Sequence, residues 1–220
     1  MFNSQKNVFW QALILAVFVF SIGILLGFSL ENWRSSQINA LYQQSELDLL
    51  DIKIQTEIYS SSNINCDKAI ENNVNFANKI YEQAKLLQKY EDSNKLTDNI
   101  ILQHKKYDLL RTLFWVNSII IKQKCNATYH NIVYLYDYNN PSLEIKAKQQ
   151  VISKLLTEIK FDKGDKVMLI PIAGDNDINS VDLLMDKYNI QKQELPIILI
   201  DEKIKISDLE TKEQLEKYLS

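Results

Sequence analysis

The chain has little glycine, little proline and no excess of positive charge. Its 220 residues include only 4 Gly and 3 Pro. Both residue types interrupt regular structure, so their scarcity predicts long elements, mostly helices. Lys and Arg number 25 against 28 Asp and Glu, which gives a net charge of −3. This balance gives no reason to expect a nucleic-acid partner.

Cysteine is also scarce, because Cys66 and Cys125 are the only two. Two cysteines without a second pair fall short of the four ligands of a structural zinc site. The segment 175–186 alternates acidic and amide side chains as a calcium loop does, but Ser180 and Asp186 stand where such a loop has Gly and Glu. We therefore expect no metal site and no cofactor.

Charged side chains are absent from residues 8–30, VFWQALILAVFVFSIGILLGFSL. A transmembrane helix needs about 20 such residues, and Trp10 and Trp33 bracket the run as interfacial aromatics do. A cleaved signal peptide is the alternative, but its apolar core usually spans about 7–15 residues and ends in a small-residue site. We expect a retained membrane anchor at 8–30 after a short tail at 1–7.

Charges around the run favour one orientation. Lys6 and the α-amino group precede it, whereas Glu31 and Arg34 follow it. Positive charge tends to stay in the cytoplasm, so the N-terminus is expected there. The rest of the chain would then be extracytoplasmic, on a single-pass protein of the cell membrane.

Two helical patterns, at 66–90 and 95–123, flank a polar break at 91–98. Apolar residues recur three or four positions apart on one face of each pattern. They are Ile70, Val74, Ala77, Tyr81 and Ala84 in the first pattern, and Leu96, Ile100, Tyr107, Leu110, Phe114 and Ile121 in the second. The two patterns predict an antiparallel helical hairpin.

Such a hairpin brings Cys66 and Cys125 to the same open end, because the polar break lies midway between them. Side chains at the ends of packed helices can meet the Cα separation of about 4.4–6.8 Å that a disulfide requires. Disulfides persist in oxidising compartments, in agreement with the expected topology. We predict a bridge, with two unrelated buried thiols as the alternative.

A further helical pattern precedes the hairpin. Its seven-residue repeat consists of Ile38, Ser45, Ile52 and Tyr59. The repeat fits a coiled coil between protomers, which would make a homo-oligomer, or a third helix packed on the hairpin. Together the segments form a predicted helical stalk at 31–125.

Three further side chains, in or next to the stalk, are not expected to form a catalytic or metal site. His104, beside two lysines, is expected on a solvated helix face, and His130 at the entry of a strand. Asn126 begins the glycosylation sequon NAT, which matters only where the host glycosylates.

The pattern changes after the stalk and predicts an α/β domain over 126–220. Strands are expected at 131–137, 167–173 and, as a pair, within 194–206, with helices at 141–161, 178–190 and 207–219. The inner face of the first helix is expected to consist of Leu143, Ala147, Val151, Leu155 and Ile159. The order is β-α-β-α-β-β-α.

This order, with YNIQKQELPIILIDEKIKI near its end, resembles the thioredoxin-like superfamily. The resemblance covers about 131–220. It implies that Pro196 opens a strand, that the Leu195–Pro196 bond is cis, and that this proline faces the family's redox-active C-x-x-C motif.

The redox motif itself is missing. Its place, after the first strand, matches Asn139, Asn140, Pro141 and Ser142, and no cysteine follows Cys125. Ser142 as a nucleophile would need a base, and no histidine follows His130. We therefore predict no catalytic residue in this turn.

The expected function is a binding or scaffolding module. A proline-flanked groove and a free strand edge suit an extended peptide or a protein partner. One alternative is a thiol–disulfide oxidoreductase, or its accessory subunit, that uses Cys66 and Cys125. A purely structural helical spacer is the other.

Overall fold

A computed structural model of the whole chain describes residues 2–61, 63–91 and 98–219. The chain divides into two compact units, Met1–Gln43 and Gln44–Ser220. The helix α1 (Phe2–Ser61) contributes to both units. Its stretch Val8–Leu30 is long and apolar enough to cross a membrane, by length and composition alone.

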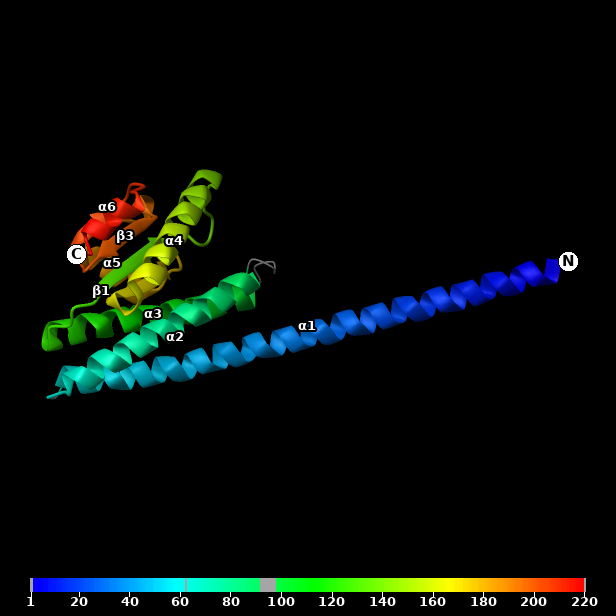
Figure 1. Cartoon of the computed structure of the whole chain (residues 1–220), viewed down its shortest axis with the longest axis horizontal. Coiled ribbons are helices and arrows are strands. Elements are labelled where there is room, and N and C mark those ends of the chain that lie inside the picture. Colours follow the sequence, from blue (N-terminus) through cyan, green and yellow to red (C-terminus); the bar gives the residue numbers. More distant parts are fainter. Residues whose placement is uncertain (1, 62, 92–97, 220) are drawn as a thin grey trace. The chain divides into compact units, whose positions relative to one another are not determined.

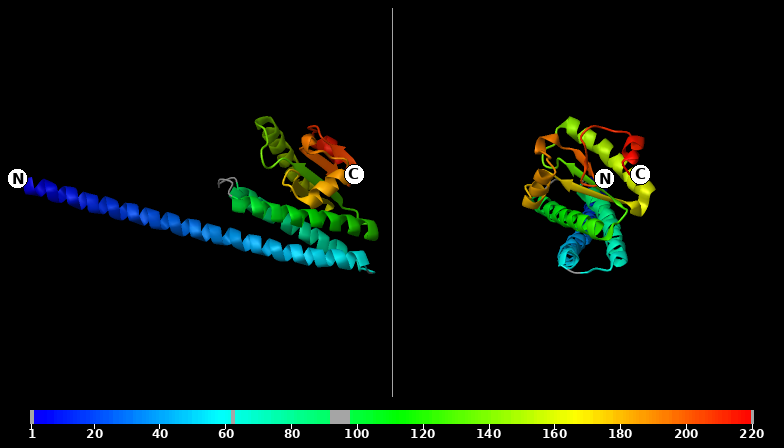
Figure 2. Two further views of the ribbon diagram at one scale, coloured as in Figure 1. Left: turned by 180° about the vertical axis from the view of Figure 1, so that it is seen from behind. Right: turned by 90° about the vertical axis from the view of Figure 1, so that its left-hand side faces the viewer.

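Three helices pack together in the second unit. The end of α1, α2 (Cys66–Glu91) and α3 (Asp98–Cys125) lie side by side, as the end-on view in Figure 2 shows. Ser45, Ile52 and Tyr59 of the seven-residue repeat are buried within this group. Lys79 of α2 forms an ion pair with Asp48 of α1 at 2.7 Å. In this unit the repeat thus forms the inner face of a third helix on the hairpin.

The rest of the chain alternates strands and helices. The elements are β1 (His130–Tyr136), α4 (Leu143–Lys163), η1 (Gly164–Lys166), β2 (Val167–Ala173), α5 (Asn179–Lys187), η2 (Lys192–Glu194), β3 (Ile197–Ile200), β4 (Ile204–Ile206) and α6 (Lys212–Lys217). The sheet has the order β2-β1-β3-β4. Strand β1 runs parallel to β2 and antiparallel to β3, and β4 pairs antiparallel with β3. The mixed sheet follows the predicted element order.

Helices cover both faces of this sheet (Figure 1). On one face, Ile152, Leu156 and Ile159 of α4 and Leu215 of α6 form a core cluster with strand residues that include Ile132 and Ile198. Successive strand residues point to opposite faces, so buried neighbours such as Val133 and Leu199 turn toward the other side. There α3 and α5 pack, and Trp115 of α3 stacks on Tyr188 at 5.4 Å.

The predicted inner face of α4 is wrong for its first half. Leu143 is 87% and Val151 54% exposed, and Ala147 is exposed too. Each step of four residues turns the helix by about 400°, so a run with constant spacing of four drifts about 40° per step. Over four steps the predicted row therefore turns from solvent at Leu143 to the core at Ile159, and Ile152 and Leu156 complete the buried face.

Candidate functional site

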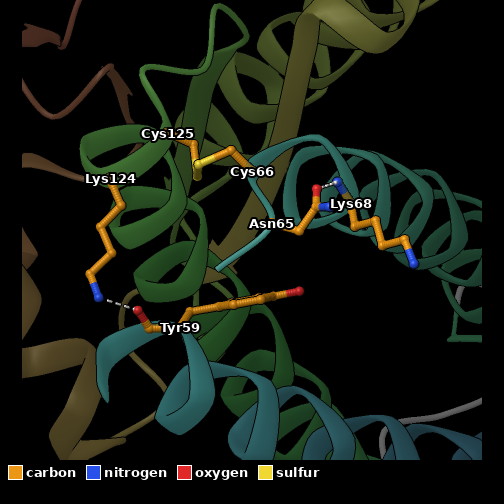
Figure 3. The surroundings of a disulfide bond; sticks show 6 residues. All are labelled: Tyr59, Asn65, Cys66, Lys68, Lys124 and Cys125. Carbon is orange, nitrogen blue, oxygen red and sulfur yellow. Dashed lines mark hydrogen bonds between the residues drawn. A yellow bond between two sulfur atoms is a disulfide. The ribbon is translucent and has the colours of Figure 1, made fainter. Parts of the chain in front are cut away.

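The disulfide links the first residue of α2 to the last residue of α3. The Cys66 and Cys125 sulfur atoms are 2.07 Å apart, and their Cα atoms are 5.3 Å apart. Figure 3 shows the two helix ends that carry them. The predicted bridge is therefore confirmed. Both cysteines are half-buried.

The surroundings of the bridge tie α1 to the hairpin. The Lys124 ammonium donates to the backbone carbonyls of Tyr59 and Ser60 at the end of α1 (Figure 3). Asn65 caps α2, because its side-chain oxygen accepts a hydrogen bond from the Lys68 N–H at 3.1 Å. The side chains buried at this end are Tyr59, Ala69 and Ile121. A thiolate at Cys66 would lie in the first turn of α2, where backbone N–H groups favour negative charge.

The turn between β1 and α4 is held by one carboxylate. Asp175 accepts hydrogen bonds from the backbone N–H groups of Tyr138 at 2.8 Å and Asn139 at 2.7 Å. Ser142 caps α4, and its hydroxyl accepts from the Ile145 N–H at 3.2 Å. Asn139, Asn140 and Ser142 are exposed. The turn is thus fixed through its backbone and presents its side chains to solvent.

A second carboxylate, Asp137, lies against Asp175 at this turn. Burial, together with a hydrogen bond to Asp175 and repulsion from its charge, raises the pKa of Asp137 above its ordinary value. A raised pKa means that the folded state binds this proton more tightly than the unfolded state. The contribution of Asp137 to stability is therefore present at acidic pH and lost as pH rises through its raised pKa.

Asp137→Asn should stabilise the protein at neutral pH, because the amide stays neutral and can donate to Asp175. The difference from wild type should vanish below the ordinary pKa of 3.8. Unfolding of the full chain in detergent, followed at pH 7 and at pH 3.5, measures both values. Asp186→Asn, at an exposed position of α5, is the matched control. A gain that is equal at both pH values would contradict the assignment.

Leu195 and Pro196 directly precede β3. The peptide bond between them is cis, and both side chains are buried. Leu195 packs closely on Gly174. A Cβ atom added at Gly174 would lie only 2.9 Å from the Cδ1 atom of Leu195. The Gly174 N–H in turn donates to the Tyr136 carbonyl at 2.9 Å. The Leu195 side chain thus packs on the residue that hydrogen-bonds to the end of β1.

Three exposed apolar side chains lie on α4 next to this turn, between exposed polar residues. They are Leu143, Ala147 and Val151, on the outer face of the first half of α4, and we call them the α4 face. Beside it, the Lys148 ammonium donates to the Ser207 carbonyl at 2.6 Å. The turn at 139–142 and the α4 face form adjoining polar and apolar surfaces, an arrangement suited to binding a protein segment.

A buried polar cluster joins α3 to the end of the sheet. Asp108 is fully buried, and its carboxylate accepts from the Asn176 side chain at 2.7 Å and lies 3.3 Å from Arg111 Nη1. Burial raises the pKa of Asp108, although His104 and Arg111 favour its ionised form. The neighbouring His104 stacks on Tyr138 at 3.7 Å.

The prediction of a solvated His104 is wrong, because this side chain is only 8% exposed. His104, Asp108 and Arg111 follow one another at spacings of four and three, so they share one helix face. In sequence such a charged face is typical of a solvated surface. Only the packing of α3 against the turn reveals that it is buried.

A second polar network connects α2, α3, β1 and the β3–β4 turn. The Asn73 amide donates to the Ser118 hydroxyl at 3.2 Å, which donates to Asn131 at 2.7 Å. The Asn131 amide and the Trp115 indole N–H both donate to Glu202. The Asn73 side-chain oxygen is buried without a hydrogen-bond partner among the described residues, whereas the other bonds of this network connect the helices to the sheet.

The remaining predicted residues are placed as follows. His130 begins β1 as expected, and its Nδ1 atom lies 2.6 Å from Asp201. Asn126 is exposed, directly after Cys125, with a φ of 52°. Among the residues that the structure describes, no three His, Cys, Asp or Glu side chains are grouped to hold a metal ion.

No family model, curated protein or solved structure matches this chain.

Proposed function

We propose that this protein is a single-pass membrane protein whose extracytoplasmic part is a thioredoxin-like binding module without a dithiol. The observation that carries the proposal is the adjoining pair of exposed surfaces, the turn at 139–142 and the α4 face. The turn occupies the position of a redox motif and contains no cysteine. What remains there is a rigid, partly apolar surface.

The thioredoxin-like assignment is supported by topology. The element order β-α-β-α-β-β-α and a cis proline directly before β3 agree with the pattern that the resemblance implies. The anchor is supported by the apolar stretch Val8–Leu30. An extracytoplasmic location is supported by the Cys66–Cys125 bridge, since disulfides persist in oxidising compartments.

The binding surface in this proposal is the α4 face with its turn, and not a groove at Pro196. A partner segment with apolar side chains would cover Leu143 and Val151 and hydrogen-bond to the exposed turn. Because the turn is held through backbone groups by Asp175, it needs no rearrangement on binding.

Leu143→Asp should abolish partner binding, because a charge at the end of the α4 face that adjoins the turn must be desolvated in the complex. A photo-crosslinking residue placed at Asn140, on the full chain in membranes, captures what lies at the turn. We expect the yield of the captured partner to fall at least tenfold, equivalent to about 1.4 kcal/mol. Leu183→Asp is the matched control, since Leu183 is 70% exposed on α5.

An adduct that survives Leu143→Asp, or that Leu183→Asp removes equally, would contradict this binding surface. Failure to capture any adduct at Asn140 would contradict a binding role for the turn itself.

Thiol–disulfide exchange by Cys66 and Cys125 is the second proposal. It is favoured by the half-buried bridge and by the position of Cys66 in the first turn of α2. The reduction potential of the pair distinguishes the two roles. Structural disulfides typically have potentials below about −300 mV, whereas catalytic pairs are more oxidising.

A further inference from the structure

Three apolar side chains form an exposed row on the part of α1 that belongs to the second unit. Leu47, Leu50 and Ile54 are 62%, 60% and 58% exposed. Their spacings of three and four place them on one helix face. The opposite face carries Ile52, which is 1% exposed and packs within the helical group. We call the three side chains the outer stripe.

We propose that the outer stripe is the contact surface of a parallel dimer of this chain, formed between two copies in one membrane. The inference rests on the membrane anchor of the proposed function. In each copy the same segment, residues 31–46, separates the span at 8–30 from the stripe. Two anchored copies therefore present their stripes in the same direction and in the same register.

The residue types suit a two-stranded parallel contact. If Leu47 and Ile54 take the a positions of a heptad, Leu50 takes the d position. Of the two a residues only Ile54 is β-branched, and a β-branched residue at a with leucine at d favours two strands in parallel coiled coils. The a row continues in the sequence, at intervals of seven, with Ala40 and Trp33.

The charges on this face of the helix include one unfavourable pair and the exposed Glu57 at the next d position. Glu46 faces Asp51 of the second copy in a parallel heptad pairing, which would be repulsive. Glu46, however, already forms an ion pair with Lys106 of its own chain. A surface hollow of about 270 Å³ adjoins Leu50 and can take a side chain of the second copy; its lining consists of Ser45, Glu46, Leu49, Leu50 and Lys106.

The size of the outer stripe explains why the anchor matters. Three side chains per copy bury much less than the roughly 1,200–2,000 Å² of a stable interface between free proteins. Anchoring confines both copies to one plane and raises their effective concentration, which allows a small contact to hold. The dimer is thus a property of the anchored protein.

Cysteine crosslinking in membranes tests the contact. Ile54→Cys is at an a position of the proposed seam, whereas Lys53→Cys is at the flanking g position, also exposed but turned about 100° from Ile54 around the helix. After mild oxidation of membranes that hold the full chain, we expect at least tenfold more disulfide-linked dimer for Ile54→Cys. Leu47→Asp added to Ile54→Cys should remove that excess. Equal yields at positions 53 and 54 would overturn the dimer.

Two further readouts separate this inference from the function it rests on. Extraction at alkaline pH tests the anchor, and labelling of Lys53→Cys in intact cells by an impermeant maleimide tests the orientation. Release of the protein from membranes at alkaline pH would contradict the proposed anchor. Absence of labelling at Lys53→Cys in intact cells would contradict the proposed orientation. An anchored, labelled protein without preferential crosslinking at 54 contradicts the dimer alone.

Discussion

Asp108→Ala should lower the free energy of unfolding by about 3–5 kcal/mol, the usual cost of removing one partner of a buried charge pair. The loss has two sources. The Arg111 guanidinium, which is only 6% exposed, loses its neighbouring carboxylate at 3.3 Å. The Asn176 amide also loses the acceptor of its 2.7 Å hydrogen bond, and a buried donor without an acceptor is itself unfavourable.

Urea unfolding of the full chain in detergent measures this loss. Asp186→Ala, at an exposed position of α5, should stay within about 0.5 kcal/mol of wild type. Arg111→Met combined with Asp108→Ala should be less destabilising than the sum of the two single changes, because the uncompensated charge is gone. A loss below about 1 kcal/mol for Asp108→Ala would show that the cluster does not hold α3 on the sheet.

Cys66→Ser should cost about 4 kcal/mol, and Cys125→Ser should cost the same. The bridge joins residues 59 positions apart, and the chain-entropy model assigns about 4 kcal/mol to a closed loop of that length. The hairpin should fray at its open end, where Lys124 holds the end of α1. Melting temperatures of the full chain under oxidising conditions measure the effect.

The double variant is the internal control for the bridge. If the loss of stability comes from the crosslink, the double Cys→Ser variant should have the same melting temperature as each single variant. Reductant should lower the melting temperature of the wild type to that value. Equal melting temperatures for wild type and all variants would mean that the bridge contributes nothing to stability.

Several parts of this architecture follow from local sequence. Residues 8–30 form an anchor-like stretch because they are a charge-free run long enough to cross a bilayer as one helix. The bridge was predictable because a polar break midway between two cysteines brings both to one end of a hairpin. The order of strands and helices follows from the change between periods of two and 3.6.

Other parts depend on which elements meet in space. The repeat that contains Ile52 was compatible with a contact between chains, and packing against the hairpin decided that it faces inward within the second unit. The row from Leu143 to Ile159 was predicted as one face of the helix. Residues spaced by four drift around a helix, so the residues buried in the core are Ile152, Leu156 and Ile159.

The sequence by itself determined the anchor-like run, the cysteine pair and the absence of a dithiol from the turn at 139–142, because each depends on residue type and spacing along the chain. Only the tertiary structure decided that His104 and Asp108 are buried and that Leu195 and Pro196 are covered. It also decided that Leu143 remains exposed. Burial of a side chain depends on packing partners that are distant in sequence. A local pattern of charged or apolar residues does not reveal which partners those are.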